Sequence, residues 1–420
     1  MTPAEEPVLK DVVLVGGGHS HGTVLKKFGM DPMPGVRRTL ISRDAYAPYS
    51  GMLPGLIAGH YTFEETNIDL GPLARFAKAR FLHDEVVGVD TSNRAVLCRE
   101  HPPVTFDVLS INIGSTPGLR VPGAKGTVVP VKPIDGFWPK WEVLRDRCLQ
   151  RRNETHIGVV GGGAGGVELL LSVQYSLDRL LERQGRSSSH LHFHLATSGD
   201  EILTTHNSRV RAKFCRVLQE RGVEVMTNSK VAAIEGSGCR LAFEKGGGLA
   251  LDEVLWVTTA RAASWPEESG FDVDDRGFIR VRDTLQTMTD ADVFAAGDVT
   301  NHPNALLGRR IRLESWENAQ NQAIATAKTM LDAGSAYGEI PWFWSDQYDV
   351  NIQLIGIPEG WTQTITRGDR ESGQFILFYL KDGQIDGAAA INSPRDIRFA
   401  RRLMAAEKVV DPNQLANPNI

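Results

Sequence analysis

Two stretches in the first half of the chain share one pattern of apolar and small residues. Residues 12–18 read as an apolar strand that runs directly into three glycines, and residues 157–163 repeat this pattern. Each apolar run has the length of a buried parallel strand, and an apolar segment of helical length follows each glycine turn. The pattern predicts an α/β protein with two doubly wound domains.

The last third of the chain has a different pattern. Residues 375–391 contain two strand-like runs on either side of Asp382-Gly383, a dipeptide that favours a tight hairpin turn. The closing segment reads as an amphipathic helix, with Arg395, Arg398 and Arg402 on the face opposite Phe399, Leu403 and Met404. These residues predict an α+β domain at the end of the chain.

The spacing of the glycines indicates what kind of ligand the two turns bind. Residues 161–166 match the Gly-x-Gly-x-x-Gly fingerprint, which permits a tight turn, a close approach of pyrophosphate and close helix–strand packing. Residues 16–21 match its first two glycines and have His21 in place of the third. Two such turns, 145 residues apart, predict that the chain binds two dinucleotides.

Histidines raise the alternative of metal binding at two places. His19 and His21 stand in the first turn, but a metal site would need a third ligand, so the nucleotide interpretation is favoured. Residues 190, 192 and 194 are histidines on one face of a predicted strand. An edge strand of the second nucleotide domain, wet on one face, explains them without a metal, and we predict no metal site.

Composition and charge exclude several classes of protein. The 420 residues carry a net charge of −5, which does not suggest a nucleic-acid-binding protein. Glycines and charges interrupt every apolar run before it reaches the length of a membrane span, and the N-terminus lacks the order of a secretion signal. The four cysteines are too far apart for a redox-active pair or a zinc ribbon. We expect a cytoplasmic protein.

Two further segments resemble a known superfamily. Residues 284–299, which end in Ala296-Gly297-Asp298-Val299, resemble the flavin-contacting motif of the FAD-dependent pyridine nucleotide oxidoreductases. The turn at 108–118 resembles the crossover of the same superfamily, with Ile113 and Ser115 in place of Ala and Thr. The resemblance implies two glutathione-reductase-like dinucleotide domains that bind FAD and NAD(P)H, with Asp298 bonded to the ribityl chain of FAD.

The two parts of the chain resemble different branches of that superfamily. The G-G-G-H-S-H turn and residues 46–61 look like the flavoprotein domain fused to selenide-water dikinases, which is related to type II NADH dehydrogenases. Residues 309–331, 341–356 and 375–403 resemble the NADH-dependent ferredoxin reductases of Rieske oxygenase and cytochrome P450 systems. The second resemblance is longer and implies a [2Fe–2S] ferredoxin as electron acceptor, indirectly feeding a Rieske oxygenase or a cytochrome P450. The alternatives are an NADH:quinone or selenium-pathway reductase, and a flavin-binding interaction protein that senses NADH.

The resemblance also implies roles for individual residues. Ser315 is the expected N-cap of a helix over 316–331, and Trp316 and Glu317 would bring their backbone to the flavin edge. Ferredoxin reductases have a lysine close to the flavin, paired with a glutamate of the NAD motif; Glu168 matches that glutamate, but residues 49–54 contain no lysine. We predict Glu168 and Trp316 as catalytic residues.

The complete set of predicted cofactor contacts divides between the two dinucleotides. For FAD the set is Gly16, Gly18, His19, Ser20, His21, Arg43, Asp44, Pro48, Gly114, Gly297, Asp298, Ser315, Trp316 and Glu317. For NAD(P) the set is Gly161, Gly163, Gly166, Glu168 and Thr197. Thr197 stands where a ribose-binding acid is usual, and no arginine follows in the next two positions. NADH is therefore favoured over NADPH.

These assignments define expected domain ranges and an acceptor surface. We expect an FAD-binding domain over 1–118 and 251–332, an NAD(P)-binding domain over 119–250 and an interface domain over 333–420. Ferredoxins are usually acidic, so complementary charge on the reductase would speed their docking. The candidate basic residues are Arg309, Arg310, Arg312, Arg395, Arg398 and Arg402, with Trp342 and Trp344 as candidate aromatic contacts.

Overall fold

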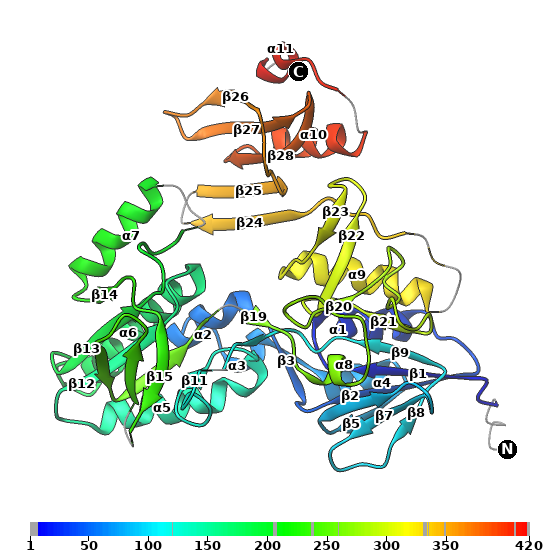
Figure 1. Cartoon of the computed structure of the whole chain (residues 1–420), viewed down its shortest axis with the longest axis horizontal. Helices are drawn as coiled ribbons and strands as arrows, with labels where there is room; N and C mark the ends of the chain where they lie inside the picture. The colour runs from blue at the N-terminus through cyan, green and yellow to red at the C-terminus, as the bar shows by residue number, and fades with distance from the viewer. Residues whose placement is uncertain are drawn as a thin grey trace. The chain divides into compact units, whose positions relative to one another are not determined.

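The computed structural model describes residues 7–417, apart from 120, 205–207, 237–238, 259, 331–333, 335, 348–349 and 407–408. The chain divides into two compact units. Figure 1 labels most of the helices and strands. Unit 1 comprises Met1–Arg43, Gly71–Ile113 and Ser264–Ile420, and unit 2 comprises Asp44–Leu70 and Gly114–Ala263. Each unit contains one five-stranded parallel sheet, which confirms the predicted fold class.

The parallel sheet of unit 1 has the strand order β21-β9-β1-β2-β5. Its strands are β1 (Lys10–Val15), β2 (Val36–Ser42), β5 (Ala79–His83), β9 (Val108–Ile111) and β21 (Val293–Ala295). Val15 at the end of β1 lies beside Ile41 and Ile111 at the ends of the adjacent strands. The carboxyl ends of the central strands therefore meet at one edge, where α1 (His19–Met30) and α9 (Trp316–Thr329) pack against each other.

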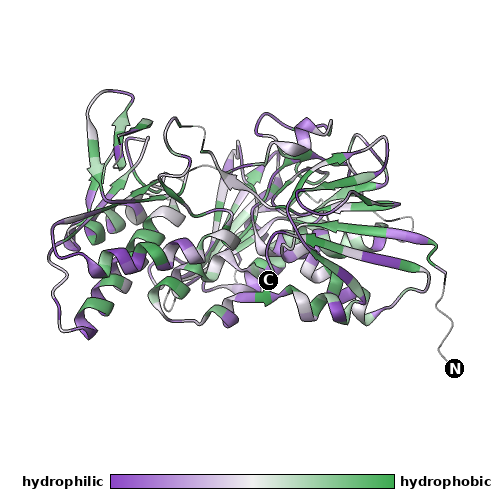
Figure 2. Cartoon of the chain, turned by 90° about the horizontal axis from the view of Figure 1, so that it is seen from below, coloured by the Kyte–Doolittle hydropathy of each residue, from purple (hydrophilic) through white to green (hydrophobic). Residues whose placement is uncertain are grey.

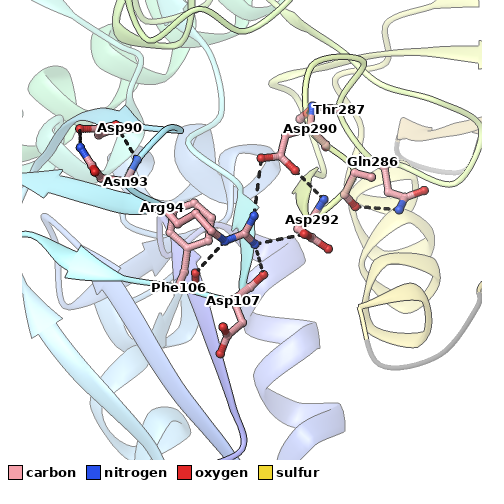
Figure 3. A network of polar contacts seen from close by, with 10 residues as sticks. Asp90, Asn93, Arg94, Phe106, Asp107, Gln286, Thr287, Asp290 and Asp292 are labelled. Carbon is pink, nitrogen blue, oxygen red and sulfur yellow. Dashed lines mark hydrogen bonds and ion pairs between the residues drawn. The ribbon is translucent and has the colours of Figure 1, made fainter.

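Smaller elements extend unit 1. They are β6 (Val86–Asp90), β7 (Ala95–Cys98), β8 (Val104–Thr105), β20 (Ile279–Arg280), β22 (Thr300–Asn304), β23 (Arg309–Ile311), α8 (Trp265–Glu268) and most of α4 (Leu70–Phe76). Arg94 joins the β6–β7 turn to the loop before β21 through ion pairs with Asp292 at 3.2 Å and Asp290 at 4.0 Å (Figure 3). Arg94 Nε also donates to the Phe106 carbonyl at 3.3 Å. This network anchors the segment that leads into Gly297.

The end of the chain forms an antiparallel sheet in the order β24-β25-β28-β27-β26. Its elements are β24 (Trp342–Gln347), β25 (Val350–Gly356), β26 (Gln363–Asp369), β27 (Gln374–Lys381), β28 (Gln384–Ile391), α10 (Pro394–Ala405) and α11 (Pro412–Ala416). Asp382 and Gly383 both have positive φ, +50° and +76°, as a type I′ hairpin turn requires. The predicted hairpin is confirmed, and so is the amphipathic helix, because Ile397, Ala400 and Met404 of α10 are buried in the domain core.

The parallel sheet of unit 2 has the order β11-β18-β12-β13-β14. Its strands are β11 (Val129–Pro130), β12 (Thr155–Val160), β13 (Leu191–Ala196), β14 (Glu224–Met226) and β18 (Glu253–Trp256). Two helices of this unit, α5 (Trp138–Gln150) and α6 (Ala164–Arg183), bury apolar residues in the same core as β12 and β13. An antiparallel sheet of β15 (Val231–Glu235), β16 (Cys239–Phe243) and β17 (Gly248–Leu251) contributes to a second core. In Figure 2, hydrophobic colour is prominent on the strands, and several helices alternate between hydrophobic and hydrophilic colours.

The remaining elements of unit 2 surround these sheets. They are β3 (Tyr46–Pro48), β4 (Asn67–Asp69), β10 (Thr116–Pro117), β19 (Ala260–Arg261), α2 (Leu53–Ala58), α3 (Phe63–Thr66), α7 (Ser208–Glu220) and the 3-10 turns η1 (Ser50–Met52) and η2 (Ile134–Gly136). Leu53, Leu56 and Ile57 of α2 are buried in the core that contains α6. This packing places residues 44–70 in unit 2, whereas the expected ranges assign them to the FAD-binding domain. Residues 333–420 likewise belong to unit 1 by their contacts, and the three-domain ranges stay a prediction.

Candidate active site

The glycine turn after β1 has a geometry that only glycine satisfies. Gly16 has φ +92°, and a Cβ at this position would lie 2.2 Å from the carbonyl oxygen of Asn112. A Cβ on Gly18 would lie 2.3 Å from Asn112 Oδ1. A side chain at either position would collide with Asn112, which directly follows β9. Only glycine therefore lets the chain pass this close to the end of β9, as in a phosphate-binding turn.

His21 occupies the position of the third glycine without any exposure to solvent. Its Nδ1 lies 2.7 Å from the Gly16 carbonyl oxygen, and its Nε2 lies 2.9 Å from Ser110 Oγ. A carbonyl oxygen only accepts, so Nδ1 carries the proton and Ser110 donates to Nε2. Burial lowers the pKa of His21 to about 4. Both ring nitrogens bond to protein atoms, so His21 holds the glycine turn against β9 through these two hydrogen bonds.

The glycine turn after β12 repeats the geometry of the first turn. Gly161 has φ +132°, and a Cβ there would lie 2.2 Å from the carbonyl oxygen of Val257, which follows β18. A Cβ on Gly166 would lie 1.8 Å from the Gly161 carbonyl oxygen, so helix and strand pack too closely for any side chain. Gly163 has open space around it. Each glycine thus has the role that the fingerprint assigns to it.

Both helices that follow these turns have starts that fit an anionic ligand. The N-caps of α1 and α6, Gly18 and Gly163, form no side-chain capping bond, and neither helix has an acidic residue in its first turn. The N–H groups at the start of a helix and the helix dipole favour a negatively charged group at such a position. The residues present therefore fit the diphosphate of one dinucleotide in each unit.

The turn after β21 lies beside α1. Gly297 has φ +81°, and a Cβ there would lie 2.5 Å from Asn112 Nδ2 and 3.0 Å from Ser20 Oγ. Ser20 Oγ donates to the Ala319 carbonyl at 2.9 Å and so joins α1 to α9. The structure therefore brings together the predicted contacts of residues 16–21 with Gly297 and the adjoining Asp298. Sequence reasoning missed Asn112, although its position directly after an apolar strand was an available signal.

The start of α9 follows the sequence prediction. Ser315 Oγ accepts a hydrogen bond from the Asn318 N–H at 3.3 Å, which confirms the N-cap. The helix ends at Thr329, and Leu331 lies outside the described residues. Trp316 is 44% exposed and packs edge-on against Trp344, with ring centroids 6.5 Å apart.

Glu317 is the second residue of α9 and has an unusual environment. Burial raises the pKa of Glu317 to about 7, although Arg401 at 4.0 Å acts in the opposite direction. Its Oε2 atom is buried and forms no hydrogen bond. Arg401 bonds more closely to Glu339, at 3.1 Å. The carboxyl group of Glu317 can therefore hold or release a proton near neutral pH.

Several predicted site residues lie in unit 2. Pro48 ends β3, Gly114 has φ +68°, and Asp44 begins the unit. Desolvation raises the pKa of Glu168 on α6, and among the described residues no lysine or arginine forms an ion pair with it. Residues 50–52 form the turn η1, within the stretch where ferredoxin reductases are expected to have the lysine close to the flavin.

The expected adenosine contacts lie at the ends of second strands. Arg43 follows β2, and its carbonyl oxygen accepts from His83 Nε2 at 2.8 Å. Thr197 follows β13, is 9% exposed, and its Cβ would lie 2.6 Å from a Cβ built on Gly162. Thr197 therefore lies directly against the second glycine turn, where a ribose-binding residue belongs.

The interpretation of residues 190–195 as an edge strand is wrong. β13 pairs with β12 on one side and with β14 on the other, so it is an interior strand of the sheet, and His194 is buried. His194 Nε2 lies 3.0 Å from His156 Nδ1, and His194 Nδ1 lies 2.9 Å from Glu224 Oε2. Over the described part of the chain, no group of three His, Cys, Asp or Glu residues has the geometry of a metal site.

None of the helices in that part is long and apolar enough to span a membrane.

Comparison with known families agrees with this geometry. The sequence model of the pyridine nucleotide-disulphide oxidoreductases matches residues 10–323. The chain belongs to this family. Membership makes it an oxidoreductase and implies FAD and NAD(H) as its cofactors. A second model, described as reductase C-terminal, matches residues 342–420, the antiparallel sheet and the helices after it.

Individual relatives cover different shares of the chain. The chain is 42% identical over 209 residues to the ferredoxin–NAD(+) reductase component of an anthranilate 1,2-dioxygenase system from Burkholderia cepacia, which covers 49% of this chain and 51% of the relative. That alignment spans about half the length of the relative. The chain is 26% identical over 433 residues to the ferredoxin–NAD(+) reductase component of a p-cumate 2,3-dioxygenase system from Pseudomonas putida, covering 98% and 97%.

Solved structures support the fold over nearly the whole chain. The covalent putidaredoxin reductase–putidaredoxin complex matches with a TM-score of 0.76 at 22% identity, covering 98% of this chain and 97% of the other. The ferredoxin reductase for the CYP199A2 system from Rhodopseudomonas palustris matches with a TM-score of 0.77 at 21% identity, covering 98% of each chain. These likenesses show the fold.

Proposed function

We propose that this protein is an FAD-dependent NADH:ferredoxin reductase that supplies electrons to an oxygenase. The observation that supports this most is the alignment of ferredoxin–NAD(+) reductase components along nearly the entire chain, C-terminal domain included. Such an enzyme oxidises NADH by a two-electron hydride transfer and delivers single electrons to a [2Fe–2S] protein. FAD supplies that two-to-one conversion when it is bound.

Unit 2 would bind NADH. The N–H groups at the start of α6 would hold the diphosphate, and Gly163 would let it approach the backbone. Thr197 would contact the adenosine ribose with a neutral hydroxyl. Because no arginine stands in the next two positions to bind a 2′-phosphate, we propose a modest preference for NADH over NADPH.

Unit 1 would bind FAD. The start of α1 would hold the diphosphate, and Gly297-Asp298 would lie beside it. The capped N-terminus of α9 would present N–H groups to the electron-rich edge of the flavin, which such a dipole stabilises. Trp316 and Glu168 stay proposed contacts of the reacting groups, and Glu168 would act without a lysine partner.

The proposed contact surface for the electron acceptor includes fewer arginines than the sequence suggests. Arg309 pairs with Glu359 at 3.1 Å, and Arg312 pairs with Glu314 at 2.9 Å. Arg310 Nε donates to Asn301 Oδ1 at 3.1 Å. These arginines are therefore occupied within the protein. The exposed residues Arg395, Arg398 and Arg402 of α10 form no ion pair within the described residues, and we propose this stripe as the contact for an acidic ferredoxin.

Two finer points belong to the same proposal. The histidine-containing first turn supports a relationship of the N-terminal two-thirds to the flavoprotein domain of selenide-water dikinases, without changing the proposed acceptor. NADH as the proposed donor favours the cytoplasm as the compartment.

The test is an anaerobic titration of the FAD-loaded protein with NADH, followed by acceptor assays. We expect bleaching of the flavin absorbance by one equivalent of NADH and rapid turnover with a [2Fe–2S] ferredoxin. A quinone and ferricyanide serve as comparison acceptors. Rapid quinone reduction together with no ferredoxin reduction would contradict the proposal.

A further inference from the structure

The peptide that joins Ala296 to Gly297 is held on both sides by buried side-chain amides. Asn112 Nδ2 donates to the Ala296 carbonyl oxygen at 2.7 Å, and the Gly297 N–H donates to Gln322 Oε1 at 2.7 Å. Asn112 is 5% exposed and Gln322 is fully buried. Asn112 directly follows β9 and Gln322 lies on α9, so residues far apart in the chain meet at one peptide plane.

The same peptide lies beside the start of α1. Asn112 Oδ1 accepts from the His21 N–H at 3.4 Å, and a Cβ on Gly18 would lie 2.3 Å from that oxygen. Asn112 thus contacts the first glycine turn with its oxygen and the Ala296–Gly297 peptide with its nitrogen. This is the edge of the sheet formed by the carboxyl ends of β1, β9 and β21, where open α/β sheets bind their ligands.

Further buried groups fix the orientation of Gln322. Its Oε1 accepts a second hydrogen bond from Thr300 Oγ1 at 3.2 Å, and its Nε2 donates to His302 Nδ1 at 3.2 Å. Burial lowers the pKa of His302 to about 4, so the ring stays neutral and accepts this bond at physiological pH. The Gln322 amide therefore cannot turn over without leaving buried groups unsatisfied.

We propose that Asn112 and Gln322 form an amide clamp that holds the Ala296–Gly297 peptide against the diphosphate-binding start of α1 and thereby sets the dinucleotide affinity of unit 1. Both are positioning residues, because they act through the peptide that leads into Asp298. The inference rests on the assignment of FAD to unit 1. It assigns the tight binding of FAD to two residues outside the predicted set of contacts.

The test compares FAD binding by the apoprotein of four variants. Asn112→Ala and Gln322→Met each remove one side of the clamp, and their combination removes both. Asn304→Ala is the matched control, because Asn304 is also buried and its amide bonds two backbone groups, Glu339 O at 3.1 Å and Leu307 N at 3.0 Å. None of the partners of Asn304 belongs to the clamp.

Each single clamp variant is expected to weaken FAD binding roughly tenfold, the equivalent of about 1.4 kcal/mol for a buried group left unsatisfied. The double variant should bind FAD little more weakly than the single variant with the larger loss of affinity, because both changes release the same peptide. Asn304→Ala should bind FAD within about twofold of the unchanged protein. Affinities within twofold for both clamp variants, or an equal loss in Asn304→Ala, would overturn the proposal.

Hydrogen exchange of the Gly297 amide in the apoprotein provides a second readout that needs no flavin. Slow exchange in the unchanged protein and in Asn304→Ala, with fast exchange in Gln322→Met, is expected. Fast exchange in the unchanged protein would overturn the clamp. If the unchanged apoprotein takes up no FAD, the proposed function fails, and the exchange measurement alone decides whether the clamp exists.

Discussion

His21 Nε2 lies 2.9 Å from Ser110 Oγ at a position with no solvent exposure. The contact joins the helix after the first glycine turn to β9, an interior strand of the parallel sheet in unit 1. A histidine at the usual place of a small residue is thus accommodated because both ring nitrogens have partners within the protein. Burial of this histidine in its neutral form should make the protein less stable at acid pH.

The first prediction concerns acid stability. The pKa of His21 is about 4 in the folded protein and about 6.5 when exposed, so the unfolded chain binds more protons between these values. The stability that neutral His21 provides is complete above pH 6.5 and is lost as the pH falls toward 4, by about 1.4 kcal/mol per pH unit at most. Urea unfolding of the apoprotein at pH 7 and pH 5 measures this slope. His21→Ala should be less stable at pH 7 and show a shallower slope; an unchanged slope would contradict the assignment.

The second prediction has the opposite sign. The pKa of Glu317 is about 7, above its ordinary value of 4.5, so the folded protein binds the extra proton between these values. Stability is therefore lost as the pH rises from 4.5 to 7. Glu317→Gln should remove this loss and stabilise the protein at pH 8, measured by urea unfolding. Glu371→Gln, at an exposed position, is the control and should change nothing.

The third prediction separates two glycines of one turn. Gly166→Ala would place a Cβ 1.8 Å from the Gly161 carbonyl oxygen and should destabilise unit 2, with a lower Tm in the absence of nucleotide. Gly163→Ala meets open space at ordinary φ and should leave the Tm unchanged while weakening NADH binding. Equal effects of both substitutions on Tm would contradict these roles.

The fourth prediction concerns the nucleotide. Thr197→Glu should sharpen the preference for NADH, because a carboxylate beside the second glycine turn would bond the ribose diol and repel a 2′-phosphate. The kcat/KM ratio for NADH and NADPH measures this preference. Ser198→Glu, at the adjoining exposed position, is the control. An unchanged ratio in Thr197→Glu would show that Thr197 does not face the ribose.

The fifth prediction concerns the acceptor. Arg398→Glu combined with Arg402→Glu should slow ferredoxin reduction severalfold at low ionic strength, mainly through the association rate, and added salt should reduce the difference. Ferricyanide reduction should barely change, because a small acceptor does not need this surface. A loss of equal size with both acceptors would contradict the proposed contact. Arg310 is unsuitable for this test, because its side chain is bonded to Asn301 within the protein.

Much of the site could be predicted from local sequence. The two glycine turns, the Ser315 cap and the Asp382-Gly383 hairpin depend on residues that are neighbours along the chain, and each occurs where the sequence indicated. The place of β13 could not be predicted in this way. Whether a strand lies at an edge depends on β14, which begins 28 residues after the end of β13.

The sequence by itself determined the elements and the chemistry of the two turns, because the conformational freedom of glycine and the period of apolar residues are local properties. Only the tertiary structure decided how the first turn is supported. Asn112 and Gln322 are separated by 210 residues, and no local pattern distinguishes them from other amides. They meet at the Ala296–Gly297 peptide because parallel strands bring distant loops to the same edge of a sheet.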